Sequence, residues 1–274
     1  NTTYDLTSVI PDSASTGTAL ATGEKTASGV VGMDPEGTVS FESISEVAKA
    51  NGWKVGVISS VSIDHATPAS FYAHEPTRGN YREIDEQLVN SGFDYFAGGP
   101  LKRPTTTSDK SEDRPDIYEM AEDAGYTVAY GYDELMALEP GGKVLAVPDY
   151  KIGGNAMYYA MDDTPENEVR LTDYVKKGIE LLDNPDGFFM MVEGGKIDWA
   201  CHANDAAASI HDTIEFDNAL AEAVKFYEEH PDETLIVATA DHETGGMTIG
   251  FAGTGYSSFI EKIEKQKVSY DQFN

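Results

Sequence analysis

A serine stands at the start of one predicted helix, in the segment Ile10–Leu20. Asp12 and Ser13 precede a run of small residues, which predicts a helix packed closely against a neighbouring element. The free N–H groups and positive dipole end of a helix N-terminus suit an incoming phosphate at Ser13, although a plain N-cap fits the same residues. The segment lacks the G-x-S-x-G frame of hydrolases, and Gly17–Thr26 does not have P-loop spacing.

A second polar segment follows an apolar run and includes His65, Thr67 and Pro68. Thr67 before Pro68 predicts a helix N-cap followed by proline at the first helical position. Arg78 lies shortly after this helix, and a guanidinium group can hold phosphate oxygens through two parallel hydrogen bonds. Arg78 is therefore a candidate phosphate clamp. A surface ion pair is the alternative in so acidic a chain.

A third segment begins where the apolar run Phe188–Val192 ends in Glu193. A carboxylate at the end of a buried strand is costly unless it is paired or bound to a metal ion. Asp198 and His202 are four residues apart, so on a helix they share one face and can bind the same zinc ion. A simple hydrogen bond between Asp198 and His202 is the alternative.

A fourth segment places Asp241 and His242 directly after the apolar run Thr234–Thr239. Oxygen and imidazole donors suit zinc here, because Cys201 is the only cysteine and excludes a thiolate cluster. A strand-end turn at Gly245–Gly246 is the alternative interpretation. Taken together, a helix-start serine, an arginine and separate acid and imidazole sets predict a phosphoryl-transfer site with several metal ions.

Short apolar runs alternate with amphipathic stretches, which predicts an α/β fold: a mostly parallel central sheet with helices on both faces. The predicted strands are Trp53–Ser59, Tyr126–Tyr130, Lys143–Val147, Phe188–Val192 and Thr234–Thr239. The predicted helices are Phe41–Ala50, Tyr81–Asn90, Asp116–Ala124, Val169–Leu182 and a long one within Ala203–Glu229. Because ligands gather at the carboxyl ends of such strands, this fold can bring the four segments together.

We expect residues 1–274 to form a single α/β domain with surface insertions, and residues 98–168 to contain the insertion loops. The polar stretches Gly98–Pro115 and Met161–Glu168 are the predicted loops. The 40% hydrophobic content excludes wholesale disorder, and no apolar run is long enough to span a membrane.

The chain is strongly acidic, with 48 Asp and Glu residues against 19 Lys and Arg residues and a net charge of −29. This excludes an electrostatic nucleic-acid partner and docking on anionic membranes. Such a surface favours solubility, and adaptation to salty surroundings is a second interpretation.

With these four motifs identified, the chain resembles the alkaline phosphatases from about Ile10 to His242, in the family's order. The resemblance implies the family's α/β fold and phosphomonoester hydrolysis through a phosphoserine intermediate, with two Zn²⁺ and one Mg²⁺. It assigns catalytic roles to Ser13 as nucleophile and Arg78 as phosphate clamp. It assigns metal ligands as follows: Asp198 and His202 for the first zinc, Asp241 and His242 for the second zinc, and Thr67 and Glu193 for magnesium.

The resemblance places Asp12, His65 and Trp199 next to these metal ligands. His65 stands where the best-known bacterial pattern has an aspartate, and Trp199 where it has a lysine, as in other branches of the family. The family also has an N-terminal aspartate and a C-terminal histidine as metal ligands. No histidine follows His242, so we expect an internal piece of a longer enzyme, poorly active by itself.

The resemblance further implies small phosphate esters as substrates, a homodimeric parent enzyme and a periplasmic or secreted location. Two alternatives stay open. One is a phosphodiesterase, sulfatase or phosphomutase on a related fold. The other is a catalytically impaired fragment that binds metal or phosphate.

Overall fold

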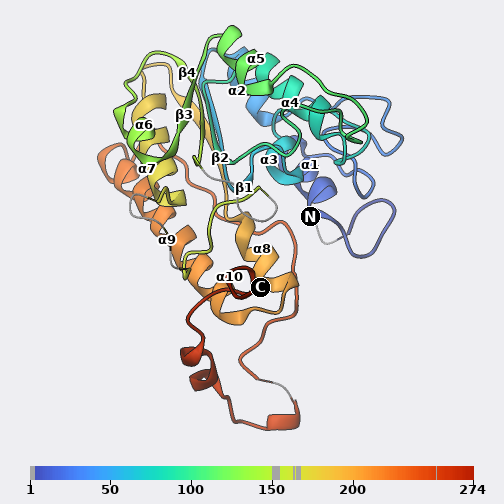
Figure 1. The fold of residues 1–274 in the computed structure, drawn as a ribbon, viewed down its shortest axis with the longest axis vertical. Helices are drawn as coiled ribbons and strands as arrows, with labels where there is room; N and C mark the ends of the chain where they lie inside the picture. The colour runs from blue at the N-terminus through green and yellow to red at the C-terminus, as the bar shows by residue number, and fades with distance from the viewer. Residues whose placement is uncertain (1–3, 150–154, 163, 165–167, 251) are drawn as a thin grey trace.

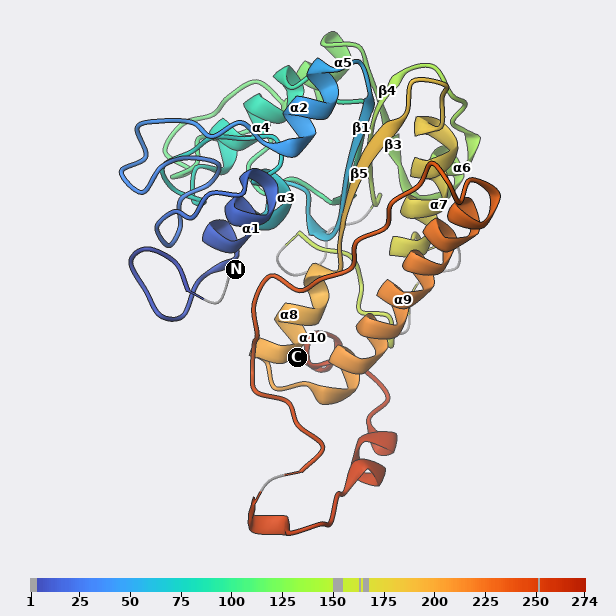
Figure 2. The same cartoon turned by 180° about the vertical axis from the view of Figure 1, so that it is seen from behind.

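The computed structural model describes residues 4–149, 155–162, 164, 168–250 and 252–274. Within these residues, strands form a fully parallel sheet in the order β3-β4-β2-β1-β5. Helices cover both of its faces (Figures 1 and 2), which confirms the predicted α/β fold. The strands are β1 (Lys54–Ser62), β2 (Tyr95–Gly99), β3 (Tyr126–Tyr130), β4 (Lys143–Val147) and β5 (Phe188–Glu193).

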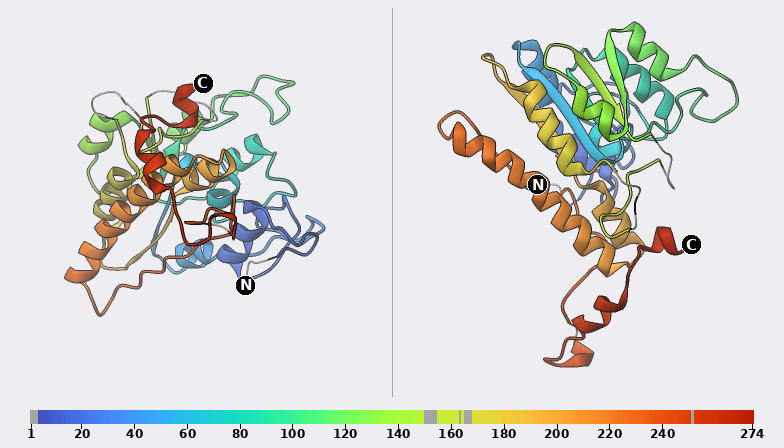
Figure 3. Two further views of the ribbon diagram at one scale, coloured as in Figure 1. Left: turned by 90° about the horizontal axis from the view of Figure 1, so that it is seen from below. Right: turned by 60° about the vertical axis from the view of Figure 1, so that its left-hand side comes forward.

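Two hydrophobic cores lie on opposite faces of the sheet. One face is covered by α1 (Ser13–Thr22), α2 (Ile44–Ala50), α3 (Ala66–Ala69), α4 (Tyr81–Asn90) and α5 (Ile117–Asp123). The other is covered by α6 (Gly131–Ala137), α7 (Leu171–Leu182) and α9 (Ala206–Glu229), seen edge-on in Figure 3. Val57 and Ile58 are fully buried, so β1 is apolar on both sides, as expected of a central parallel strand.

The carboxyl ends of β1 and β5 lie side by side, with Ser59 opposite Glu193 in the ladder. Short helices begin just beyond both strands: α3 after β1, and α8 (Gly195–His202) after β5. The chain then continues through α9 to a segment that extends away from the sheet and contains η1 (Ala252–Thr254) and η2 (Ile260–Lys265) (Figure 1). The last helix, α10 (Tyr270–Phe273), returns to lie beside α8, where Asp271 pairs with Lys196.

The predicted strand Thr234–Thr239 is wrong. This run pairs with no strand among the described residues, and Leu235 and Val237 are 88% and 75% exposed. A strand is stabilised by hydrogen bonds to a neighbouring strand and by side chains packed over one of its faces. The run Thr234–Thr239 has neither, so its hydrophobic sequence alone does not make it a strand. Conversely, the sequence reading missed β2, whose short run ends in two glycines.

The remaining predicted elements are present, with ends shifted by up to three residues. The stretch Gly98–Pro115 is a loop from residue 100 onward and mostly lies at the surface, as expected. In the predicted loop Met161–Glu168, residues 163 and 165–167 lie outside the described residues. None of the described helices is both long and apolar enough to cross a membrane.

Candidate active site

Ser13 is the first residue of α1 and lies against the segment after α9. Its Oγ is 2.9 Å from His242 Nε2, a contact between residues 229 positions apart in the chain. His242 Nε2 is also 3.3 Å from Asp241 Oδ2, which accepts a hydrogen bond from Thr16 Oγ1 at 3.3 Å. The predicted serine and the predicted Asp–His pair therefore share one site.

The second Asp–His pair joins the same site through Thr244. Thr244 Oγ1 donates to Asp198 Oδ1 at 2.6 Å and is 3.1 Å from His242 Nδ1. Asp198 Oδ1 lies 3.5 Å from His202 Nε2, one helical turn further along α8. The His202 side chain is 70% exposed, so this end of the site opens to solvent.

Glu193 lies partly buried at the end of β5. Ser59 Oγ donates a short hydrogen bond to Glu193 Oε2, as expected from their opposite positions in the ladder. Burial raises the pKa of Glu193 to about 7; the Ser59 and Thr67 hydroxyls lower it, while the charges of Asp241 and Asp198 raise it. Glu193, Asp198 and Asp241 thus repel one another electrostatically.

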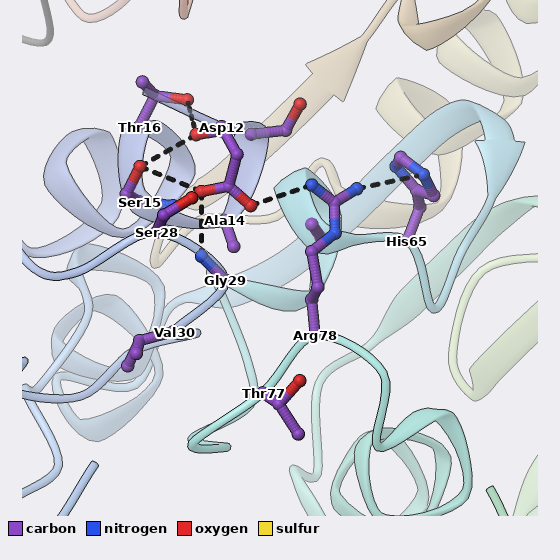
Figure 4. A network of polar contacts seen from close by, with 12 residues as sticks. Asp12, Ala14, Ser15, Thr16, Ser28, Gly29, Val30, His65, Thr77 and Arg78 are labelled. Carbon is purple, nitrogen blue, oxygen red and sulfur yellow. Dashed lines mark hydrogen bonds and ion pairs between the residues drawn. The ribbon is translucent and has the colours of Figure 1, made fainter. Parts of the chain in front are cut away.

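Asp12 caps α1 and also holds Arg78 (Figure 4). Asp12 Oδ1 accepts from the N–H groups of Ser15 and Gly29, both at 3.0 Å, and Oδ2 accepts from Arg78 Nη1 at 3.0 Å. One N–H group at this helix N-terminus is therefore already satisfied. Burial raises the Asp12 pKa, but the Gly29 and Ser15 bonds and Arg78 outweigh it, and the net pKa is lowered.

His65 links Arg78 to α8. Its Nε2 is 3.3 Å from Arg78 Nη2, and its ring meets the Trp199 ring edge-on with centroids 5.8 Å apart. Burial, together with the charges of Arg78 and Lys102, holds the pKa of His65 well below its usual value. A neutral imidazole here contacts the arginine without repelling it.

The small residues of α1 allow it to pack closely on α3, as the sequence predicted. A Cβ atom at Gly17 would lie 2.9 Å from Ser70 Oγ and 3.2 Å from Thr67 Cα. The N-cap of α3 is His65 rather than Thr67, so the predicted cap is wrong by two residues. Thr67 instead lies within the helix, where the Glu193 carboxylate is the one polar partner near its buried hydroxyl among the described residues.

The eleven sequence-predicted site residues form three groups of contacts that adjoin along the chain. Ser13, Asp241 and His242 connect through Thr244 to Asp198 and His202. Asp12, Arg78, His65 and Trp199 form a second group, and Glu193 and Thr67 a third. Sequence reasoning missed two hydroxyl residues that organise these groups: Ser59, which bonds Glu193, and Thr244, which bridges the two Asp–His pairs. Ser59 could have been found from strand register, since it ends a predicted strand parallel to the one ending in Glu193. Thr244 lies in a loop, and no periodicity signals its position.

The donor set fits metal cations. Three carboxylates, two imidazoles and the Thr67 hydroxyl belong to the site. Arg78 and the neighbouring Lys196 are paired with Asp12 and Asp271 instead. Oxygen and nitrogen donors of this kind suit zinc and magnesium. Within the described part of the chain, no three His, Cys, Asp or Glu side chains are grouped tightly enough to hold an ion by themselves.

The sequence model of one family, described as alkaline phosphatase, matches residues 1–272. The chain belongs to the alkaline phosphatase family. It is 35% identical to alkaline phosphatase 4 of Bacillus subtilis, over 89% of this chain and 51% of that protein. It therefore spans about half the length of this relative.

Solved structures of the family agree with the fold. A cold-active alkaline phosphatase from the psychrophile Shewanella sp. is 31% identical with a TM-score of 0.84, covering 97% of this chain and 63% of that one. A mutant of the alkaline phosphatase from the Antarctic bacterium TAB5 is 32% identical with a TM-score of 0.75, covering 89% of this chain and 67% of that one. The TAB5 mutant has Mg bound in its M3 site.

Proposed function

We propose that this chain carries the catalytic core of a metal-dependent phosphomonoester hydrolase that acts through a phosphoserine intermediate. The observation that supports this most strongly is the 2.9 Å contact between Ser13 Oγ and His242 Nε2. This contact places the hydroxyl of Ser13, at the start of α1, beside the pair Asp241–His242, which Thr244 links to the pair Asp198–His202. The chain also belongs to the alkaline phosphatase family.

In this proposal Ser13 Oγ attacks phosphorus, the bond from phosphorus to the leaving oxygen breaks, and water later hydrolyses the phosphoserine to release phosphate. Arg78 clamps the phosphate oxygens, and Asp12 and His65 hold its two guanidinium nitrogens in place. Trp199 packs against His65 and so fixes that support from the side of α8.

The cofactors in the proposal are two Zn²⁺ and one Mg²⁺. Asp198 and His202 would hold one zinc ion, Asp241 and His242 the other. Thr67 and Glu193 would hold magnesium, with Ser59 orienting Glu193. When bound, the ions would stabilise the attacking and leaving oxygens and lower the pKa of the nucleophile.

The substrates in this proposal are small phosphate esters, because Ser13 and Arg78 are assigned to the phosphate group and no residue is assigned to the alcohol. No nucleic acid or membrane serves as a specific partner of so acidic a chain. The parent enzyme is proposed to be a homodimer in the periplasm or the extracellular medium. These points derive from the family resemblance and the net charge of −29.

Replacing Ser13 by Ala in the protein that contains this chain tests the proposal. We expect turnover of p-nitrophenyl phosphate to fall by at least about 1000-fold, while zinc content measured by elemental analysis stays nearly unchanged. The control is Thr22→Ala at the far end of α1, where the hydroxyl donates to the carbonyl of Thr18 and accepts from the N–H of Glu24. Near-normal turnover in Ser13→Ala would exclude the nucleophile assignment.

The same preparations separate the alternatives. Turnover of a phosphodiester or a sulfate ester above that of the monoester would assign a related hydrolase instead. Zinc and phosphate binding without any turnover would assign a binding module.

A further inference from the structure

A second group of carboxylates is buried on the α4 side of the sheet, and the proposed mechanism does not use it. Asp64 follows the end of β1, and Asp85 lies on α4; both residues are 0% exposed. The Ser62 side chain, at the last position of β1, is also 0% exposed. These three residues form what we call the β1–α4 cluster.

The oxygen atoms of the β1–α4 cluster have almost no partners outside the cluster. Both carboxylate oxygens of Asp85, Oδ1 of Asp64 and Oγ of Ser62 are buried, and their neighbours are one another: Ser62 interacts with Asp64, and Asp64 with Asp85. The exception is Asp64 Oδ2, which accepts from the backbone N–H of Lys102 at 2.7 Å. Burying two negative charges side by side costs several kcal/mol, so the cluster needs either a bound cation or a proton to neutralise it.

The neighbouring cations of the chain do not supply this positive charge. Arg82 gives Nη1 to the carbonyls of Pro104 and Pro115 and Nε to Glu86. Lys102 Nζ donates to the hydroxyl of Tyr81. Both positive charges act on the cluster only from a distance.

We propose that the β1–α4 cluster is a structural binding site for one hard divalent cation, Ca²⁺ or Mg²⁺, held by Asp64, Asp85 and Ser62. Its donors are all oxygen atoms, which such cations prefer, and two carboxylates balance the charge of one divalent ion. The ion would join the end of β1 to α4 and fix the turn that leads to His65.

This site is separate from the one proposed for magnesium, because the two share no residue. Glu193 faces Ser59 and Thr67, whereas Asp64 faces Ser62, Asp85 and the Lys102 backbone. Burial raises the pKa of Asp64 and raises that of Asp85 still further, with the Asp64 charge adding to it. The competing arrangement is therefore one proton shared by the two carboxyl groups.

Cation-dependent stability of the purified chain distinguishes these two arrangements. The chain is treated with a chelator, then CaCl₂ or MgCl₂ is titrated at pH 8 with ionic strength held constant by NaCl, so that general screening of the acidic surface does not contribute. We expect saturating cation to raise the melting temperature by about 5 °C or more. Asp85→Asn should lose most of this rise and one equivalent of bound divalent metal.

Glu86→Gln is the matched control: it removes one charge from the same helix, at a partly exposed side chain paired with Arg82. It should keep the full cation response. Equal responses and equal metal content in the unaltered chain and Asp85→Asn would overturn the proposal. So would an Asp85→Asn chain that is more stable than the unaltered chain at pH 8 at every cation concentration, since this identifies a shared proton.

Ser62→Ala covers the case in which Asp85→Asn does not fold. It removes one neutral donor, and we expect it to need severalfold more cation for half of the stabilisation. An unchanged half-saturating concentration in Ser62→Ala would count against the site.

Discussion

The carboxylate of Asp12 connects the N-terminus of α1, the Gly29 loop and Arg78, so its replacement should affect both stability and phosphate binding. Asp12→Asn keeps an acceptor for the N–H groups of Ser15 and Gly29 but turns an amide N–H toward Arg78 Nη1. Asp12→Ala removes all three interactions and also the hydrogen bond from the Ser15 hydroxyl. The two variants therefore separate the ion pair from the helix cap.

The expected losses differ accordingly. An N-cap contributes about 1 kcal/mol, and a half-buried ion pair with Arg78 contributes about 1 kcal/mol. We expect the free energy of unfolding to fall by about 1 kcal/mol in Asp12→Asn and about 2–3 kcal/mol in Asp12→Ala, which also loses the Gly29 contact. Urea unfolding monitored by circular dichroism measures both values.

In both variants Arg78 keeps only its 3.3 Å contact with His65. A loosely held guanidinium must be ordered when phosphate binds, so we expect KM for p-nitrophenyl phosphate to rise about tenfold, which corresponds to about 1.4 kcal/mol. The net pKa of Asp12 is lowered on folding. Its contribution to stability is therefore complete above the unfolded pKa of about 3.9 and is lost as pH falls below it.

Asp116 provides the matched control, because it caps α5 through a 2.9 Å bond to the N–H of Tyr118, in a different part of the fold. Asp116→Ala should lose about 1 kcal/mol of stability with no change in KM. An unchanged KM in Asp12→Asn would refute the positioning of Arg78 by Asp12. Equal stability losses in Asp12→Ala and Asp116→Ala would show that the contacts of Asp12 with Gly29 and Arg78 add nothing to stability.

Three further outcomes are expected. The melting temperature should rise from low to molar NaCl, because salt screens the repulsion of a chain with net charge −29, and a flat or falling curve would count against this. Burial raises the pKa of Asp212 to about 7. The free energy of unfolding therefore falls between about pH 4 and pH 7, where Asp212 would ionise in the unfolded chain but stays protonated in the folded one, and the loss remains above pH 7. Asp212→Asn should then raise the free energy of unfolding by up to about 4 kcal/mol at pH 8 and by much less at pH 5, as measured by urea unfolding. Equal increases at the two pH values would contradict the raised pKa of Asp212. Thr244→Val should weaken zinc binding about 10- to 100-fold in competition with a chelator, and Thr244→Ser should restore it. Identical zinc affinity in both Thr244 variants would show that the hydroxyl does not orient Asp198.

The sequence predicted the sheet, most helices and the clustering of the site, because each rests on local signals. Continuous apolar runs identified β1 and β5, and the polar residues that end them had to meet at one edge of a parallel sheet. The spacing of Asp198 and His202 placed them on one helix face, where they are observed.

Other features depend on contacts between distant segments, which a local pattern does not contain. The run Thr234–Thr239 is as apolar as β5, yet the partner that would make it a strand is absent among the described residues. The cap of α3 fell on His65 because the chain turns there after β1. The pairing of Asp64 with Asp85 required the packing of α4 against the end of β1.

The 229 residues between Ser13 and His242 also set the order of events during synthesis. At about 5–20 residues per second, a ribosome makes His242 roughly 10–45 s after Ser13. Helix α1 is therefore synthesised before either Asp–His pair exists. Ser13 and His242 can come together only after His242 has been made, so a nascent chain that ends before His242 has no assembled site.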